Sequence, residues 1–187
     1  MPQSGSDDAL NAALAADRAQ ALALFGEIVS RETWARLDQF VALLIRRQKT
    51  LNLVAASTLP QIWTRHVADS LQLLALAPTA RKWIDLGAGG GFPGLVIACA
   101  LAEPPGAQVH LVESTQKKAA FLRDVALALS LPAIVHARRI EDFVASNRQM
   151  PNPRQRCGER GNRVVGANPL IGVGAQAPLA PARQLTP

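Results

Sequence analysis

Apolar residues in the first part of the chain recur at the spacing of an α-helix. Ala9–Leu24 is rich in Ala and Leu and has few helix breakers, so a helix is predicted there until Gly26 interrupts it. Ser30 suits the N-cap of a second helix that ends near the basic residues 46–49. A third helix is expected from about Pro60 to Leu76. Residues 1–77 are therefore predicted to form a helical N-terminal layer.

After residue 77 the pattern changes to short apolar runs that alternate with helical segments. Strands are expected at Trp83–Leu86, Val109–Val112 and Ala133–Val135, and helices at Leu95–Leu101 and Lys117–Leu129. This alternation is typical of a parallel sheet with right-handed crossovers. The predicted fold class is α/β, with a cofactor-binding core over residues 78–147 and the helical layer as an N-terminal extension.

The regular pattern stops after Asn147. Residues 150–187 contain six prolines, five glycines and no aromatic residue. Such a composition buries too little surface to offset the entropy of ordering it, so a disordered tail rich in Arg, Pro, Gly and Ala is predicted over residues 148–187. Three strands are few for a doubly wound sheet, and the sheet is expected to be incomplete with an open edge.

The net charge of +6 is unevenly distributed. Residues 1–147 carry 14 Lys and Arg against 13 Asp and Glu, whereas residues 148–187 carry six Arg against Glu159 alone. The overall basicity is therefore no evidence that the folded part binds nucleic acid.

Other features of the chain concern its compartment. Cys99 and Cys157 lack metal-ligand spacing and fit a reducing compartment, and no metal site is predicted. No run approaches the roughly 18 apolar residues that span a bilayer. Residues 1–30 carry four acidic residues in place of the basic start of an export signal. We expect a cytoplasmic protein without a membrane partner.

The segment Asp85–Gly94, which reads DLGAGGGFPG, lies between a predicted strand and a predicted helix. Glycines at such a junction let the backbone turn sharply and approach a ligand. A glycine-rich turn without a ligand is the alternative interpretation. Gly89, Gly91 and Gly94 also match the dinucleotide pattern G-x-G-x-x-G. However, Asp85 would repel a diphosphate and attract a cation with an ammonium and a sulfonium group, such as S-adenosylmethionine.

Two further regions are candidates for cofactor contacts. Glu113 ends the next predicted strand, where its carboxylate can accept hydrogen bonds from ribose hydroxyls, although a solvated strand-end acid is the alternative. After the third strand, Ile140 can pack on an adenine ring and Glu141 can meet its polar edge. A charged start of a helix explains Glu141 equally well.

With these residues in view, the sequence resembles the bacterial RsmG (GidB) family over about residues 40–143. The resemblance rests on a series of motifs in the family's order, namely Asn52-Leu53, Arg65-His66, Asp69-Ser70-Leu71, Asp85–Gly94, Glu113-Ser114, Lys117-Lys118, Phe121–Arg123 and Arg139–Phe143. Family members are S-adenosylmethionine-dependent methyltransferases that modify guanine N7 in 16S ribosomal RNA. The resemblance therefore implies a Rossmann-like class I methyltransferase fold, and 16S ribosomal RNA or the small ribosomal subunit as the partner of a monomeric enzyme.

The resemblance also implies roles for individual residues. The implied cofactor-binding residues are Asp85, Gly87, Gly89, Gly91, Phe92, Glu113, Ile140 and Glu141. The implied positioning residues in the cleft are Asn52, Arg65, His66 and Asp69. Candidates for RNA phosphate contacts are Arg46, Arg47, Lys49, Lys117, Lys118 and Arg123, each of which a solvated helix face also explains. Guanine N7 carries no proton to remove, so an ordinary structural histidine is an equal alternative for His66.

After Asn147 the sequence departs from the family. The family's Asp-containing fourth strand and Ser-Arg-Ala segment are not recognisable, and the change in composition is typical of truncation or of translation in a shifted reading frame. Two alternatives to an active methyltransferase stay open: a non-catalytic cofactor- or RNA-binding remnant and, less favoured, an NAD-type dinucleotide oxidoreductase.

Overall fold

The computed structural model describes residues 4–146 and 162–166 of the chain. The N-terminal elements are α1 (Ser4–Phe25), α2 (Arg31–Leu51), the 3-10 helix η1 (Ala56–Gln61), the π-helix η2 (Trp63–Ala68) and α3 (Asp69–Leu76). The following elements are β1 (Lys82–Leu86), α4 (Gly94–Ala100), β2 (Gln108–Val112), α5 (Gln116–Ala128), β3 (Ala133–His136), α6 (Ile140–Ser146) and β4 (Asn162–Gly166). The strands and helices predicted from the sequence up to residue 146 are present, with bounds that differ by a few residues and with one helix divided.

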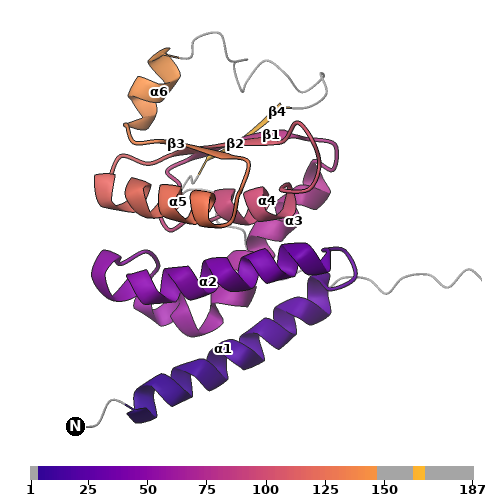
Figure 1. Cartoon of the computed structure of the whole chain (residues 1–187), viewed down its shortest axis with the longest axis vertical. Helices are drawn as coiled ribbons and strands as arrows, with labels where there is room; N and C mark the ends of the chain where they lie inside the picture. Colours follow the sequence, from indigo (N-terminus) through magenta and orange to yellow (C-terminus); the bar gives the residue numbers. More distant parts are fainter. Residues whose placement is uncertain (1–3, 147–161, 167–187) are drawn as a thin grey trace, which may run out of the picture.

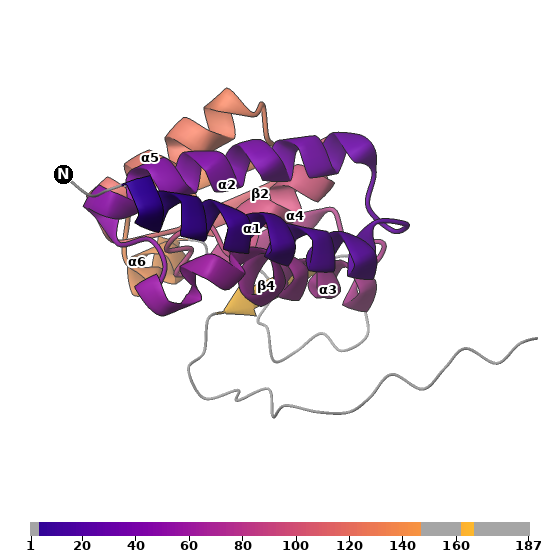
Figure 2. The same cartoon turned by 90° about the horizontal axis from the view of Figure 1, so that it is seen from below.

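The elements form layers (Figure 1). The sheet has α6 on one face and α4 with α5 on the other, and α2 and then α1 lie farther out beyond α4 and α5. Figure 2, seen from below, shows α1 and α2 running across the α/β part of the molecule. The helical N-terminal residues are therefore a layer on one face of the α/β core.

The sheet is parallel, with the strand order β3-β2-β1-β4. Trp83 in β1 is aligned with Val109 in β2, and Val109 is aligned with Ala133 in β3. Helices α4 and α5 return the chain from β1 to β2 and from β2 to β3. This is a Rossmann-like arrangement, which confirms the predicted α/β fold class. In open parallel sheets of this kind, ligands bind at the carboxyl ends of the strands, where the strand order reverses. Here the order reverses at β1, which places the loop after β1 at that position.

One sequence prediction is wrong in part. Residues 162–166, expected to belong to a disordered tail, form β4 and pair with β1 along Lys82–Leu86. Composition averaged over forty residues conceals one short run with the β-branched residues Val164 and Val165. The remainder of the predicted tail, residues 148–161 and 167–187, lies outside the described residues.

The predicted third helix is also divided. Pro60–Leu76 contains the end of η1, the π-helix η2 and α3 rather than one continuous α-helix. Asp17 in α1 explains the new start at Trp63, because its carboxylate accepts hydrogen bonds from the backbone N–H groups of Trp63 and Thr64 at 2.7 and 3.3 Å. Apolar spacings of three to five residues do not distinguish α- from π-helical turns.

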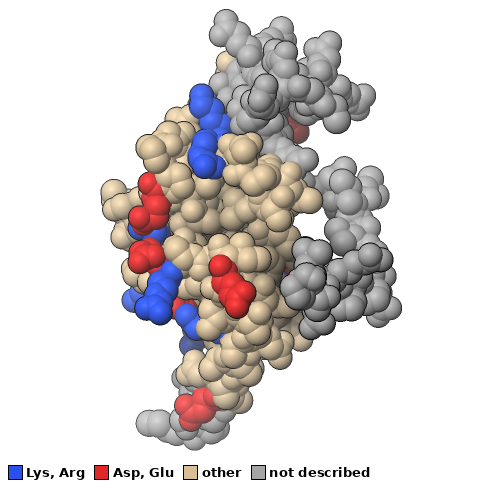
Figure 3. Space-filling model, turned by 90° about the vertical axis from the view of Figure 1, so that its right-hand side faces the viewer, with Lys and Arg blue, Asp and Glu red and all other residues tan. Residues whose placement is uncertain are grey.

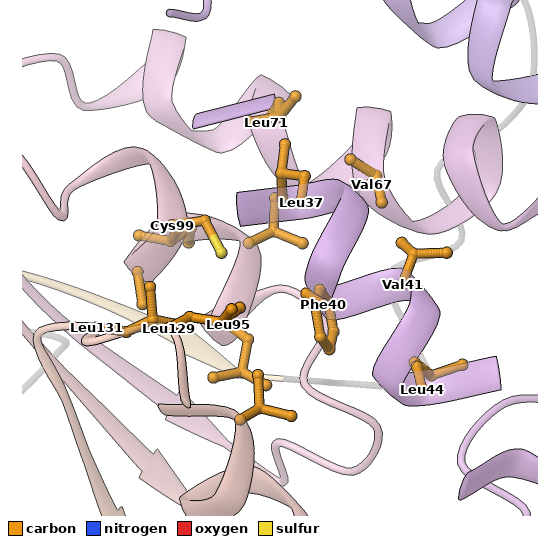
Figure 4. Close-up of a cluster of buried hydrophobic side chains, with 14 of the residues drawn as sticks. Leu37, Phe40, Val41, Leu44, Val67, Leu71, Leu95, Cys99, Leu129 and Leu131 are labelled. Atoms are coloured by element: carbon orange, nitrogen blue, oxygen red, sulfur yellow. The ribbon is translucent and has the colours of Figure 1, made fainter. Parts of the chain in front are cut away.

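A single hydrophobic core joins the N-terminal layer to the α/β part. The N-cap of α2 is Ser30 as predicted, with its hydroxyl accepting the N–H of Thr33 at 3.1 Å. Figure 4 shows the buried face of α2 packed towards side chains of α3, η2, α4 and the end of α5. The core residues labelled in the figure are Leu37, Phe40, Val41, Leu44, Val67, Leu71, Leu95, Cys99, Leu129 and Leu131.

Polar contacts fix α1 on the outside of this layer. The guanidinium of Arg18 makes a two-pronged ion pair with Asp38, at 2.5 and 2.7 Å, and lies over the rings of Trp34 and Trp63. Such planar pairing is the strong form of an arginine contact. Within the described part of the chain, no helix is both long enough and apolar enough to cross a membrane.

Candidate functional site

The glycine-rich loop after β1 is held to the end of β2 by backbone hydrogen bonds. The N–H groups of Gly87 and Ala88 donate to the carbonyl oxygen of Val112, at 2.9 and 3.0 Å. Gly87, Gly89 and Gly91 have φ values of +91°, +51° and +100°. L side chains rarely adopt such values, so the sharp turn depends on glycine at these positions.

The glycines of this loop fall into two groups, according to how much room an added Cβ atom would have. A Cβ atom on Gly90, Gly91 or Gly94 would lie 2.8 Å or less from Leu53 O, Leu95 Cδ1 or Leu111 Cδ2 respectively. A Cβ atom on Gly87 or Gly89 would find no atom closer than 3.7 Å. The first three glycines are thus required by close packing, and Gly87 and Gly89 border free space.

Asp85 is buried at the carboxyl end of β1. Its Oδ2 accepts a hydrogen bond from the N–H of Gly94 at 2.9 Å, whereas its Oδ1 is buried without a partner among the described residues. The pKa of Asp85 is raised to about 7, mainly by burial; the Gly94 hydrogen bond opposes the shift and the nearby charge of Glu113 adds to it. A buried carboxylate with a free oxygen lacks one donor.

Glu113 follows β2 and is also buried, with an exposed fraction of 8%. Its Oε2 accepts the N–H of Gly89 at 2.9 Å, and its Oε1 accepts the N–H of Thr115 at 2.7 Å. Each carboxylate oxygen can accept a second hydrogen bond, so Glu113 can hold the loop and still receive donors from a ligand.

A pocket of about 190 Å³ opens beside Glu113. It is lined by Gly87, Val112, Glu113, Ser114, Arg139, Ile140 and Glu141. Four residues proposed as cofactor contacts, Gly87, Glu113, Ile140 and Glu141, therefore come together from the segments that follow β1, β2 and β3. The volume is below the roughly 300 Å³ at which sites for drug-sized ligands begin, so the pocket encloses only part of a larger ligand. Ser114 and Arg139 had no individual role assigned from the sequence, although both belong to motifs on which the resemblance rests.

Phe92 and His66 lie away from this pocket, where the loop meets the N-terminal layer. The ring centroid of Phe92 is 4.9 Å from that of His66 and 5.2 Å from that of Phe40. His66 is half-buried, and its Nε2 is 3.0 Å from the hydroxyl oxygen of Thr58. Burial lowers the pKa of His66, with Asp69 opposing the shift and Arg65 adding to it. Phe92 therefore packs between layers and is not among the residues that line the pocket. The lowered pKa of His66 favours its neutral, hydrogen-bonded imidazole.

The other proposed positioning residues lie around His66 or at the end of α2. Arg65 is exposed, with its Nε 3.4 Å from Gln61 Oε1, and the carboxylate of Asp69 accepts a weak hydrogen bond from Gln72 at 3.4 Å. Partial burial raises the pKa of Asp69, which the charges of His66 and Arg65 oppose. Asn52 is the left-handed C-cap of α2, with φ +46°. Arg65, His66 and Asp69 thus form one group, and Asn52 is placed by the turn after α2.

Two buried polar residues in the N-terminal layer were missed by the sequence analysis. Gln48 binds the backbone after α2, and Asp17 binds the backbone at the start of η2. Each occupies a position on the apolar stripe of its helix, after Leu44 in α2 and after Leu14 in α1. A polar residue at such a position is the signal that could have found them.

The basic residues proposed for RNA contact lie on two neighbouring helices. Arg46, Arg47 and Lys49 are exposed at the end of α2, and Lys117 and Arg123 are exposed on α5, with Lys118 partly buried. The two helices pack together, and the guanidinium of Arg47 is 3.4 Å from Asp124 of α5. Figure 3 shows another feature of the charge distribution, since Lys and Arg alternate with Asp and Glu along one edge of the face that it presents.

Comparison with known proteins gives consistent matches. The GidB family profile, described as rRNA small subunit methyltransferase G, matches residues 33–152. A protein named ribosomal RNA small subunit methyltransferase G from Bradyrhizobium sp. strain BTAi1 is 63% identical over 131 residues, which are 70% of this chain and 58% of that protein. Its namesake from Bradyrhizobium diazoefficiens is 58% identical, covering 75% of this chain and 54% of the relative.

Two further matches complete the comparison. The namesake from Bradyrhizobium sp. strain ORS 278 is 54% identical over 166 residues, covering 88% of this chain and 74% of the relative. A crystal structure from Klebsiella pneumoniae, of a protein provisionally named an O-methyltransferase, aligns with a TM-score of 0.48 at 16% identity and covers 75% of this chain and 58% of that chain. The chain thus spans between about half and three quarters of the length of these relatives.

Proposed function

The chain belongs to the GidB family, the rRNA small subunit methyltransferase G proteins, and from this premise we propose that it transfers a methyl group from S-adenosylmethionine to guanine N7 of 16S ribosomal RNA. A ribosomal substrate implies a place in the cytoplasm. The relatives' names support methylation of small-subunit ribosomal RNA. The cofactor is inferred from the residues below, and guanine N7 is what the family resemblance implies.

The observation that carries the proposal is the free oxygen of Asp85. A buried carboxylate whose Oδ1 has no partner among the described residues needs a donor, and the ammonium group of the methionine moiety supplies one with a full positive charge. The residues present therefore fit this cofactor. Gly87 and Gly89 leave free space on the side where the backbone would pass the ligand.

The remaining parts of the cofactor would be held at the ends of β2 and β3. Glu113 has spare acceptor capacity on both carboxylate oxygens for the two ribose hydroxyls. Ile140 is partly exposed at the pocket wall and would cover one face of the adenine, with Glu141 beside its polar edge. These roles agree with those implied by the family motifs.

The same geometry weighs against a dinucleotide. In dinucleotide-binding folds the first N–H groups of the helix after the glycine loop receive the diphosphate. Here the N–H of Gly94, the first residue of α4, already donates to Asp85. A diphosphate would therefore meet a carboxylate where it needs a donor.

The proposed reaction is a direct displacement. The lone pair of guanine N7 forms a bond to the methyl carbon while the carbon–sulfur bond breaks, its electron pair stays on sulfur, and the positive charge passes to the guanine. No proton has to be removed, so the task of this chain is to align the two partners and to exclude water. The lowered pKa of His66 favours a neutral imidazole beside Phe92, where it would pack or donate a hydrogen bond without adding a positive charge near the cationic methyl donor.

RNA would reach this site across the helical side. Exposed cations at the end of α2 and on α5 lie on adjoining helices and would neutralise backbone phosphates. Phosphate contacts of this kind position RNA without reading its sequence, so the choice of guanine would depend on contacts closer to the cleft, where Asn52, Arg65, His66 and Asp69 are the candidates.

The experiment is a methyl-transfer assay with tritiated S-adenosylmethionine. Small ribosomal subunits and naked 16S RNA from cells that lack this modification are the substrates. We expect label at a guanine N7, detected as a position of base-specific chain cleavage. Binding of the cofactor without any transfer would support the alternative of a cofactor-binding protein without activity, which the partial coverage of its relatives keeps open. Label on another base or atom would contradict the proposed specificity.

A further inference from the structure

Gln48 is a buried amide in the last turn of α2, on the apolar stripe that the helix turns towards the core. Its Oε1 accepts hydrogen bonds from the N–H groups of Leu53 and Val54 at 2.9 and 3.0 Å. Its Nε2 donates to the carbonyl oxygen of Val54 at 2.7 Å. One side chain therefore satisfies three backbone groups of the turn that follows the helix, where regular pairing has ended.

This turn contacts the glycine-rich loop. A Cβ atom on Gly90 would lie 2.8 Å from the carbonyl oxygen of Leu53 and 3.3 Å from its Cβ, so the two backbones are in close contact. The neighbour Gly89 donates its N–H to Glu113. Gln48 is thus connected to Glu113 through Leu53, Gly90 and Gly89 in a continuous series of contacts.

An apolar residue could fill the space of Gln48 but could not hold the turn. It would leave the N–H groups of Leu53 and Val54 and the carbonyl of Val54 unpaired, of which the Leu53 N–H is in buried surroundings. Unpaired backbone groups of this kind favour rearrangement of the turn towards water. The turn would then lose its close contact with Gly90.

We propose that Gln48 is a positioning residue for the cofactor site, and that it fixes the glycine-rich loop by holding the 52–54 turn against Gly90. The inference rests on the proposed function as far as the ligand is concerned. Its structural part, the coupling of position 48 to the loop, holds whether or not a ligand binds. Asn52 directly precedes Leu53 in the same turn, and its N–H donates to the backbone carbonyl oxygen of Gln48.

The test compares three variants. Gln48→Met keeps the volume and loses all three hydrogen bonds, and Gln48→Glu keeps the acceptor and loses the donor. Thr50→Ala is the control, because Thr50 is exposed on the same helix end and bonds only the carbonyl oxygen of Arg47. The first readout is amide hydrogen exchange, by NMR, of Gly89 and Gly91, whose N–H groups bond Glu113 and Ala88. The second is the Kd for S-adenosylhomocysteine by calorimetry.

For Gln48→Met we expect exchange at Gly89 and Gly91 to rise about tenfold and the Kd to rise about tenfold, the equivalent of one net hydrogen bond. Gln48→Glu should fall between Gln48→Met and the wild type, and Thr50→Ala should match the wild type. The N–H groups of Gln108 and Val109, which bond Arg81 and Pro132 at the other end of the strands, are the internal reference. A purely structural role would accelerate exchange there by the same factor, and that result would overturn the proposal.

A double-mutant cycle with Gly90→Ala tests the connection itself. In the wild type the added methyl group meets a fixed carbonyl, whereas in Gln48→Met the freed turn can move aside. Gly90→Ala should therefore accelerate loop exchange less in the Gln48→Met background than alone, by about threefold or more. Additive effects would overturn the inference. If the wild type fails to bind S-adenosylhomocysteine, that result counts against the proposed function. The two exchange measurements would still test whether Gln48 fixes the loop.

Discussion

The side chain of Glu113 holds the backbone of Gly89, which precedes it by 24 residues, through a 2.9 Å hydrogen bond from the Gly89 N–H to Oε2. The bond joins the end of β2 to the loop after β1. It means that the acid proposed to bind ribose also shapes the loop proposed to bind the methionine moiety. A substitution at Glu113 is therefore expected to affect every part of an adenosyl ligand.

Glu113→Gln should weaken binding of S-adenosylhomocysteine and of 5′-methylthioadenosine alike, because both contain the ribose. The expected loss is about 1.5 to 3 kcal/mol, the range of a hydrogen bond to a charged group. Isothermal titration measures both ligands, and Glu32→Gln, at an exposed acid in the first turn of α2, is the control. Unchanged binding of both ligands would show that Glu113 does not contact ribose.

Asp85→Asn should weaken the binding of one of these two ligands and not of the other. The amide oxygen can still accept the N–H of Gly94, so the fold is kept, but the charge facing an ammonium group is lost. We expect S-adenosylhomocysteine to lose about 1.5 to 3 kcal/mol of binding free energy and 5′-methylthioadenosine, which has no ammonium group, to bind nearly as before. Equal losses for both would mean that Asp85 acts only by supporting α4.

The raised pKa of Asp85 gives this site a pH dependence. Because its pKa is about 7 in the free protein, roughly half of the molecules carry a protonated carboxyl group at neutral pH. A bound ammonium group favours the ionised form, so affinity for S-adenosylhomocysteine should rise between about pH 6 and pH 8, with proton release on binding. Titrations in two buffers of different ionisation enthalpy measure the released protons. Asp85→Asn should release none at this site.

The glycines should separate into two groups when changed to alanine. Gly94→Ala would place a methyl group 2.2 Å from Leu111 and 2.6 Å from Asp85, and should cost about 1 to 3 kcal/mol of stability. Gly89→Ala meets no close atom, and at φ +51° should cost about 1 kcal/mol. Its methyl group nevertheless points to the ligand side, so Gly89→Ala should lose affinity for S-adenosylhomocysteine. Urea unfolding and calorimetry test the pair, and retained affinity in Gly89→Ala would place the ligand elsewhere.

A histidine pair couples the sheet to α6. His110 Nδ1 and His136 Nε2 lie 2.9 Å apart with ring planes tilted by 15°, and the ring of Phe143 in α6 lies 4.7 Å from His136. One nitrogen must donate and the other accept, so only one proton fits between them. Burial lowers the pKa of both imidazoles. Lys82 adds to the shift at His110, and His110, Arg138 and Arg123 add to it at His136.

The pair should make the protein less stable in acid. When the pKa of a histidine is lower in the folded state, the unfolded state takes up the proton first as the pH falls. The folded protein therefore keeps its full stability above the unfolded pKa of about 6.5 and loses stability as the pH falls below that value. Urea unfolding at pH 7 and pH 5 should show this loss, and His136→Gln, which does not titrate, should show a smaller one. His66→Gln, outside the pair, should reduce the loss by its own separate amount, because burial also lowers the pKa of His66. An equal acid sensitivity in the wild type and His136→Gln would contradict the assignment.

The sequence predicted the fold up to residue 146 because its apolar spacings agree with the tertiary structure. The positions of Asp85 and Glu113 followed from strand ends alone, since parallel strands bring their carboxyl ends to one edge. Contacts between distant segments were not predictable in this way. Asp17 meets Trp63 only because α1 crosses η2, and no local pattern encodes that crossing.

Two local features of the structure also lie beyond what the sequence pattern encodes. The strand β4 gains its pairing from β1, a partner far away in the sequence, and its own five residues carry little signal. The contact of Phe92 with a cofactor, expected from its place in the glycine-rich motif, stays a prediction, whereas the packing of its ring with His66 and Phe40 was not foreseen. The motif specifies the course of the backbone, whereas the direction of a side chain depends on the layer packed against it.

The most direct test of the central claim, that the loop after β1 and Glu113 bind an adenosyl cofactor, is a calorimetric titration of the wild-type chain with S-adenosylhomocysteine and, in parallel, with NAD. We expect saturable binding of S-adenosylhomocysteine at one site per chain, lost or strongly weakened in Glu113→Gln, and no heat of binding with NAD. Binding of NAD without detectable binding of S-adenosylhomocysteine would contradict the assignment of the site.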